Sequence, residues 1–266
     1  MSDRSADAAA ASVTERRAQA EAGAGPEPTL HYLTVARTAR YATVGAAPAH
    51  TAQLWIALHG YGHRAADFIA PFGAVAPADT RVVAPEGLSR FYLEMPRPDG
   101  GHLARTGASW LTRDDREVEL RDALAMLHAV VAREVAAVTA ARGAPPALHL
   151  LGFSQGVAMS MRWVVEAAGN PALRRPAPVH SHVLWAGGLA HDVPDDALRA
   201  AWRATAVHAV WGSRDRFASE AARDAARQRF SAIGVTPRMH TFEGGHRLDA
   251  SVLGALFART GTSPGP

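Results

Sequence analysis

A serine at position 154 has the surroundings that a catalytic nucleophile needs. It is the central residue of Gly152-Phe153-Ser154-Gln155-Gly156, which follows an apolar run and precedes residues with helical spacing. This order predicts a strand, a tight turn and a helix, with the serine at the turn. Glycines on both sides let such a turn close. The alternative is a serine that only caps a helix, but we interpret Ser154 as a nucleophile.

Two residues farther along the chain could activate this serine. Serine is a poor nucleophile at neutral pH, and it needs a base and a group that orients the base. His246 follows the last predicted strand through a Gly-Gly turn, and Asp215 follows the strand before it. Because ligands bind at the carboxyl ends of parallel strands, these side chains should meet there. We predict that His246 is the base and Asp215 its orienting acid.

Other histidines and acids compete for these roles. His240 lies within a predicted strand and His182 begins one, so neither is as free to reach the serine. The rival acids follow an earlier strand: Asp192, Asp195 and Asp196. Asp195 could equally be the N-cap of a helix, and the alternative for Asp215 is an ordinary turn residue.

The oxyanion of an acyl-transfer reaction needs backbone N–H donors. One should come from Gln155, directly after the nucleophile, and the other from Tyr61 in the Gly-rich segment 59–63. His59 and His63 in that segment are four residues apart, but on a turn and not on a helix face. No HExxH motif is present, so the sequence predicts no metal site.

The elements that would position these residues alternate along the chain. Strands are expected at 31–36 and 41–44 as a hairpin, then at 53–58, 81–84, from 147, and at 183–186, 207–211 and 237–242. Helices are expected at 65–72, from a capping-box-like start at Thr112 and Asp115 to Val138, after Ser154, and at 195–202, 219–233 and 248–258. The pattern predicts an α/β fold with a mostly parallel sheet of about seven or eight strands and helices on both faces.

Length and composition suit one domain. The 266 residues are 48% hydrophobic, and no internal repeat is found. Residues 1–28 have the composition of a disordered tail, which leaves 29–262 as a single α/β domain. The tail lacks the apolar segment of a secretory signal, and no apolar run approaches a membrane span in length. We therefore expect a cytoplasmic protein without an integral membrane segment.

Charge and cysteine content exclude other classes. The sequence pI is about 9.9, but the net charge is only +3, and the 28 basic residues, all arginine, are scattered. A nucleic-acid-binding protein would concentrate them on one surface, so we expect no nucleic-acid partner. The absence of cysteine excludes disulfides, thiolate metal sites and a cysteine nucleophile.

Several of these motifs together resemble a known family. His59-Gly60-Tyr61-Gly62, Pro85-Glu86-Gly87, Ser109-Trp110, 152–156, Asp215 and Gly244-Gly245-His246 are similar to the α/β-hydrolase family of small carboxylesterases, lysophospholipases and acyl-protein thioesterases. The resemblance covers about residues 30–260. It implies the α/β-hydrolase fold and serine-dependent hydrolysis of carboxylic esters or thioesters without a cofactor. By match to its motifs, Ser154, Asp215 and His246 would be the triad, and Tyr61 and Gln155 the oxyanion donors.

The sequence departs from the family pattern at three places. His63 stands where the family often has an acid, and Ala218-Ser219 stand where it usually has Val-Pro. Val157 stands where the turn that carries the nucleophile, called the elbow from here on, commonly has a second glycine. These positions border the site, so the substrate is left open: an ester of short to medium acyl chain, a lysophospholipid or a thioester. A homodimer and a non-catalytic, ligand-binding relative are also left open.

The segment 88–111 is the expected lining of an acyl pocket. Pro and Gly residues within it predict an irregular excursion, and about 20 residues between two later strands leave no room for a large cap. The apolar residues expected to form the pocket wall are Phe91, Tyr92, Met95 and Trp110. The alternative is that they only pin the segment to the body of the protein.

Overall fold

The computed structural model describes residues 28–94, 105–169 and 178–260. The chain divides into two units, Met1–Thr38 and Ala39–Pro266. In the first unit, the described residues 28–38 are exposed and contain no helix or strand. The predicted strand at 31–36 is therefore wrong. A strand forms only where a neighbouring strand pairs with it, and none of the described strands pairs with this segment.

The second unit is built on a seven-stranded sheet with the order β1-β3-β2-β6-β7-β8-β9. Its strands are β1 (Tyr41–Gly45), β2 (Gln53–Leu58), β3 (Thr80–Pro85), β6 (Ala147–Phe153), β7 (Val179–Trp185), β8 (Ala206–Gly212) and β9 (Arg238–Phe242). All neighbouring pairs are parallel except β1 with β3, where Tyr41 lies opposite Pro85. The mostly parallel sheet is confirmed, whereas the predicted hairpin of 31–36 with 41–44 is wrong.

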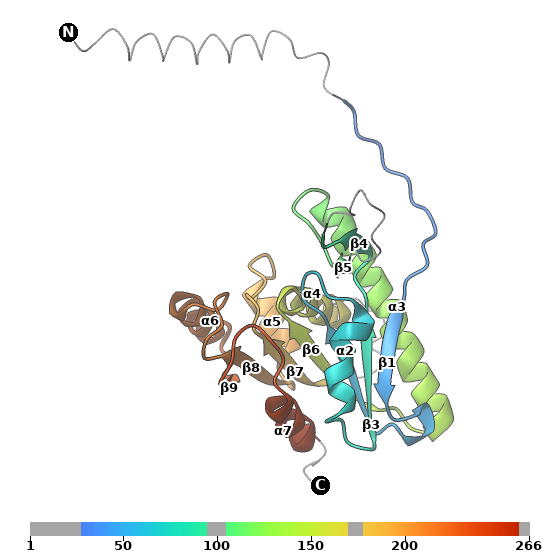
Figure 1. The fold of residues 1–266 in the computed structure, drawn as a ribbon, viewed down its shortest axis with the longest axis vertical. Coiled ribbons are helices and arrows are strands. Elements are labelled where there is room, and N and C mark those ends of the chain that lie inside the picture. The colour runs from blue at the N-terminus through green and yellow to red at the C-terminus, as the bar shows by residue number, and fades with distance from the viewer. Residues whose placement is uncertain (1–27, 95–104, 170–177, 261–266) are drawn as a thin grey trace, which may run out of the picture. The chain divides into compact units, whose positions relative to one another are not determined.

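Helices cover both faces of the sheet (Figure 1). They are α2 (Ala65–Gly73), α3 (Arg116–Arg142), α4 (Gln155–Gly169), α5 (Asp195–Ala201), α6 (Glu220–Ile233) and α7 (Ala250–Thr260), with a short 3-10 turn, η1 (Pro48–His50). The helices α2 and α7 contact each other, and α4 contacts both α3 and α5. Between β7 and β8 the chain is fully described and contains only α5, so no cap domain lies there.

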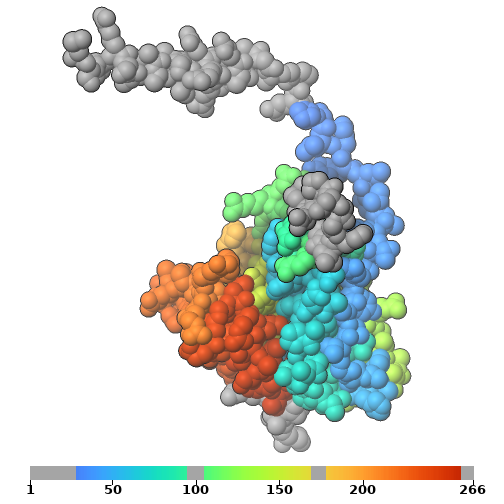
Figure 2. All heavy atoms as spheres, in the orientation of Figure 1, coloured from blue at the N-terminus to red at the C-terminus, as the bar shows by residue number. Residues whose placement is uncertain are grey.

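Alternate residues of β2 show how the two faces are filled. Leu54, Ile56 and Leu58 pack with residues of α3 and α4, whereas Trp55 and Ala57 pack with residues of α2 and α7. Side chains of a strand point alternately to opposite faces, so a continuous apolar run is what a strand covered on both sides requires. In Figure 2 the cyan atoms of α2 and the red atoms of the C-terminal segment lie side by side on the face shown.

The segment 88–111 is more ordered than expected. Its two described ends form the antiparallel strands β4 (Ser89–Tyr92) and β5 (Thr106–Ser109), with Ser89 opposite Ser109. The predicted irregular excursion is wrong at both ends, where the chain pairs as strands even though Gly107 lies within β5. Met95 lies outside the described residues.

The helix α3 begins later than expected. Asp115 occupies its N-cap without a side-chain cap bond, and Thr112 donates instead to the carboxylate of Glu119, with its Oγ1 at 2.9 Å. Gly143 ends the helix in the left-handed conformation, as the sequence indicated. By length and composition alone α3 could cross a membrane, which the sequence analysis did not foresee. Half of that stretch is buried within the protein, as in a core helix.

Three histidines are buried in the domain as neutral side chains. His182 donates from Nε2 to Ser160 Oγ and accepts at Nδ1 from the Trp202 indole, so both nitrogens are occupied. Burial lowers the pKa of His182 to about 3 and that of His59 to about 4. Burial, together with the neighbouring His180 and His208, lowers the pKa of His149 to about 3. Protonation would place an unsolvated charge in the interior.

We expect these histidines to make the protein sensitive to mild acid. Their folded-state pKa values lie below the ordinary 6.5, so the unfolded chain binds more protons below that pH. Stability should be fully present above pH 6.5 and fall by about 1.4 kcal/mol per pH unit for each histidine below it. Urea unfolding between pH 7.5 and 5 measures this. His182→Gln should reduce the pH dependence by about one proton, whereas a change at the exposed His50 should not. An equal slope in His182→Gln and the wild type would contradict the assignment.

Candidate active site

Ser154 lies in a strained turn between β6 and α4. Its φ is 53°, a left-handed conformation that a non-glycine residue rarely adopts. The turn depends on close backbone packing: a Cβ on Gly152 would lie 2.4 Å from the Gly156 carbonyl oxygen, and one on Gly156 would lie 2.2 Å from that of Leu58. The Ser154 N–H donates to the Trp185 carbonyl at 2.8 Å, which ties the turn to the end of β7. The strand, strained turn and helix predicted around Ser154 are therefore confirmed.

His246 and Asp215 meet at the carboxyl ends of β8 and β9. Nδ1 of His246 lies 2.8 Å from Oδ2 of Asp215. The Asp215 side chain is fully buried and that of His246 is 21% exposed. The second carboxylate oxygen of Asp215 accepts from the Phe217 N–H at 2.9 Å, which fixes its rotation. Because a carboxylate only accepts, Nδ1 carries the proton, and Nε2 is left as the atom that can act as a base.

The imidazole lies beside the elbow. Its ring centroid is 4.9 Å from that of Phe153, the residue before Ser154. No hydrogen bond joins the side chains of Ser154 and His246 in the described part of the chain. Such bonds are often long before substrate binds and shorten in the reactive complex. The structure thus brings the predicted base and acid together and packs the base against the neighbour of the predicted nucleophile.

Two of the rival acids, Asp192 and Asp195, and both rival histidines are engaged elsewhere. Asp192 is paired with Arg162 at 2.6 Å and with Arg116 at 2.9 Å, and the Arg162 hydrogen bond holds the pKa of Asp192 well below its usual range. Asp195 is paired with Arg229 at 3.2 Å. His240 Nε2 lies 3.0 Å from His208 Nδ1. Among the described residues, no group of three or more metal-ligating side chains comes together.

The two predicted oxyanion donors are available. Gln155 begins α4, so its N–H has no partner within the helix, and neither it nor the Tyr61 N–H is hydrogen-bonded within the described residues. The Tyr61 loop lies against the elbow, since a Cβ on Gly60 would be 3.0 Å from Cβ of Ser154. The adjacent Gly62 N–H donates to Ala108 at 2.9 Å and anchors the loop on β5. Both donors can therefore face a ligand near Ser154, and their catalytic role stays a prediction.

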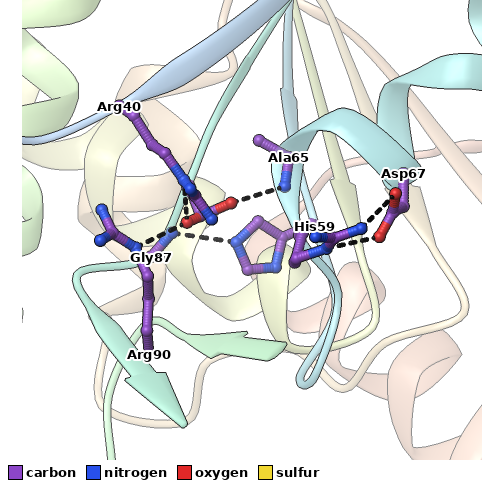
Figure 3. Close-up of polar contacts among 8 residues, drawn as sticks. Arg40, His59, Ala65, Asp67, Gly87 and Arg90 are labelled. Carbon is purple, nitrogen blue, oxygen red and sulfur yellow. Dashed lines mark hydrogen bonds and ion pairs between the residues drawn. The ribbon is translucent and has the colours of Figure 1, made fainter. Parts of the chain in front are cut away.

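A network of buried hydrogen bonds and ion pairs holds the segment that carries Tyr61 in place (Figure 3). His59 Nδ1 donates to the Gly60 carbonyl at 2.8 Å, and its Nε2 accepts from the Gly87 N–H at 2.9 Å. The neighbouring Glu86 is 2% exposed and accepts from Arg40 at 2.6 Å, Arg90 at 2.9 Å and the Ala65 N–H at 3.0 Å. The Ala65 N–H is at the start of α2, where a negative charge is favourable. The network fixes both ends of the turn that carries Tyr61.

Sequence reasoning overlooked three structural contributions to the site. The Gln155 side chain accepts from the Trp110 N–H at 3.2 Å and donates to the Leu111 carbonyl at 3.0 Å, joining α4 to the end of β5. Ala186, after β7, has a φ of 52° and is the other non-glycine residue with positive φ among those described. Phe217 packs on His246 with ring centroids 4.8 Å apart. The amide side chain within the elbow was the one available signal, because strain and ring contacts depend on the tertiary fold.

The predicted pocket residues lie in different environments. Trp110 is 1% exposed, stacks on His59 and donates its indole N–H to the His59 carbonyl at 2.8 Å. This placement agrees with the alternative in which Trp110 pins the segment to the body. Phe91 is half-buried against Tyr61, with ring centroids 4.9 Å apart, and Tyr92 is exposed. A hollow of about 530 Å³ lies nearby, with Gly62, Leu93 and Thr106 in its wall. A pocket formed by Phe91, Tyr92 and Trp110 stays a prediction.

Comparison with known proteins identifies the fold. No protein-family model matches the sequence, and no curated protein is similar enough in sequence to be a relative. Several solved structures are similar to this one. The structure of esterase PE8 has 22% sequence identity and a TM-score of 0.54, and the match covers 84% of this chain and 98% of that one. A phospholipase/carboxylesterase from Dyadobacter fermentans has 17% identity and a TM-score of 0.55, covering 85% and 97%. Zea mays acyl-protein thioesterase 2 has 17% identity and a TM-score of 0.58, covering 83% and 99%.

The protein has the α/β-hydrolase fold. The similarity extends over nearly the full length of each of these three structures, and the seven-stranded, mostly parallel sheet with helices on both faces agrees with it. At these identities the likeness defines the fold, whereas function has to be argued from the site.

Proposed function

We propose that this protein is a serine hydrolase that cleaves carboxylic esters of short to medium acyl chain. The observation that carries the proposal is the buried Asp215 carboxylate, 2.8 Å from His246, with the imidazole packed beside the strained Ser154 turn. A fixed histidine tautomer, a serine in a strained turn and free N–H donors at a helix start are the parts that acyl transfer needs.

The reaction follows from these positions. Ser154 Oγ attacks the acyl carbon while Nε2 of His246 takes the hydroxyl proton, and Asp215 stabilises the imidazolium that forms. The Tyr61 and Gln155 N–H groups bind the oxyanion. His246 then gives its proton to the leaving alcohol, which departs as an acyl-enzyme ester remains on Ser154. Water, activated by His246 in turn, attacks this ester and releases the acid.

The same groups would cleave a thioester or the acyl ester of a lysophospholipid. The similarity of the fold to Zea mays acyl-protein thioesterase 2 supports keeping the thioester as the second candidate. Matched ester and thioester substrates with the same acyl group separate the candidates, because only the leaving group differs. A higher kcat/KM for the thioester at every chain length would replace the proposed ester substrate.

Covalent labelling distinguishes an enzyme from a non-catalytic binding protein. A fluorophosphonate probe should modify the folded protein at Ser154 alone, because among the serines of residues 28–94, 105–169 and 178–260 only this one combines a neighbouring base with free N–H donors for the phosphonyl oxygen. The modified residue is identified by peptide mass spectrometry, with heat-unfolded protein as the control. Absence of labelling, or equal labelling of folded and unfolded protein, would contradict the proposed mechanism.

A further inference from the structure

An apolar cleft of about 320 Å³ lies on the side of the elbow away from the segment expected to line the acyl pocket. Its lining residues come from the segment after β7, the end of β8 and the helix α6. Its walls include Gly187, Leu189, Trp211, Phe217, Ala222 and Ala225. The volume is at the lower end of the range for small-molecule sites, and an aliphatic and aromatic lining is typical of them.

The cleft borders the reactive groups on two sides. Gly187 packs against the elbow so closely that a Cβ there would lie 2.2 Å from the Ser154 carbonyl oxygen. Phe217 forms another wall, and its ring is 4.8 Å from that of His246. One wall therefore adjoins the nucleophile and another adjoins the base, so a group attached to the acyl carbon can extend directly into the cleft.

The charged residue in the wall is not available to a ligand. The Arg229 guanidinium donates to the Ala190 carbonyl at 2.5 Å and the Val193 carbonyl at 2.7 Å, and it pairs with Asp195 at 3.2 Å. These bonds use one N–H of each guanidinium nitrogen and hold Arg229 on the loop that carries Ala190. The cleft consequently offers mostly apolar surface, with Arg229 held on backbone carbonyls and His191 as the other polar side chain in its wall.

The α6 wall leaves space because it carries small side chains. Ala222 and Ala225 lie three residues apart and therefore on the same side of the helix. On the opposite wall, a Cβ on Gly188 would meet no atom within 4 Å, so the cleft is open there. A larger side chain at Ala225 would occupy the volume without disturbing the core, since Ala225 itself is exposed.

We infer that this cleft binds one uncharged alkyl or aryl arm of the ester substrate. The inference rests on the proposed function, since the arm reaches the cleft only when its carbonyl is at Ser154. It adds a second specificity site to the predicted one at the β4–β5 segment, so that the acyl and alcohol arms can lie on opposite sides of the nucleophile.

Ala225→Leu tests the inference, with Ser231→Leu as the matched control, because Ser231 is an exposed residue of α6 nine positions after Ala222 and so lies on the side of the helix away from the cleft. Two substrate series are measured: esters of one alcohol with acyl chains of graded length, and acetate esters of alcohols of graded length. In the series that varies the arm bound in the cleft, Ala225→Leu should lower kcat/KM for the long members relative to the short ones by at least about tenfold. One methylene that a pocket can no longer accommodate changes kcat/KM by at least this factor. Ser231→Leu should keep the wild-type profile.

The results separate this inference from the proposed function. A shift in the acyl series assigns the cleft to the acyl arm, and a shift in the alcohol series assigns it to the leaving group. Unchanged profiles in both series, or the same shift in Ser231→Leu, would overturn the inference while ester hydrolysis by the wild type still supports the proposed function. If the wild type cleaves no member of either series, the proposed function itself fails.

Discussion

Ser154→Ala should reduce kcat for ester hydrolysis on the order of 10⁶-fold, to the limit of detection. The substitution removes the hydroxyl of the residue that occupies the left-handed turn between β6 and α4, directly before the free N–H of Gln155. The fold should persist, because the Ser154 backbone N–H, and not its hydroxyl, makes the bond to Trp185. Turnover is measured with an activated ester, and folding by thermal unfolding of the same sample.

Ser251→Ala is the matched control, since Ser251 is an exposed serine in the first turn of α7. It should keep wild-type turnover. Near-normal hydrolysis by a folded Ser154→Ala protein would remove Ser154 from the mechanism and with it the proposed function.

Asp215→Asn should lower kcat by about 10⁴-fold, the loss that a triad suffers when its acid can no longer fix the histidine tautomer. The carboxylate accepts from Nδ1 of His246 at 2.8 Å and from the Phe217 N–H at 2.9 Å, so both oxygens act as acceptors. An amide can supply only one acceptor oxygen. With the Phe217 bond retained, its NH₂ would face Nδ1, which favours the tautomer that has its proton on Nε2.

Asp192→Asn and Asp195→Asn provide the comparison. Both residues follow β7, and both are paired with arginines away from the elbow. Their substitution should change kcat only mildly, although Asp192→Asn should destabilise the fold because the buried Arg162 loses its charged partner. The opposite ranking of the three variants would move the catalytic acid to the end of β7. Steady-state kinetics and urea unfolding of each variant measure the two effects separately.

Local sequence patterns were enough to predict most of the parallel sheet and the chemistry at its edge. Apolar runs bounded by Gly, Pro and polar residues mark β2, β3, β6, β7 and β8 because strands covered on both faces need continuous apolar residues. The Gly-Phe-Ser-Gln-Gly segment marks the elbow because close backbone packing there leaves no space for a Cβ on either glycine. Asp215 and His246 were found because each follows a strand, and parallel strands bring their carboxyl ends to one edge.

Pairing between distant segments could not be derived in this way. Residues 31–36 include strand-forming Tyr, Thr and Val, but none of the described strands pairs with them, whereas β1 pairs antiparallel with β3, about 40 residues farther along the chain. The ends of a segment rich in Pro and Gly pair as β4 and β5. The choice of partner depends on which surfaces meet after the helices have packed.

The sequence by itself therefore determined the order of Ser154, Asp215 and His246 and the elements that carry them, because periodicity and turn chemistry are local properties. Only the tertiary structure decided that Trp110 is buried on His59, that Glu86 lies in the network beneath the Tyr61 loop, and that a cleft lies beside Phe217 and α6. Each of these depends on side chains from elements far apart in the chain. Their burial and contacts are set by how the helices and loops pack on the sheet.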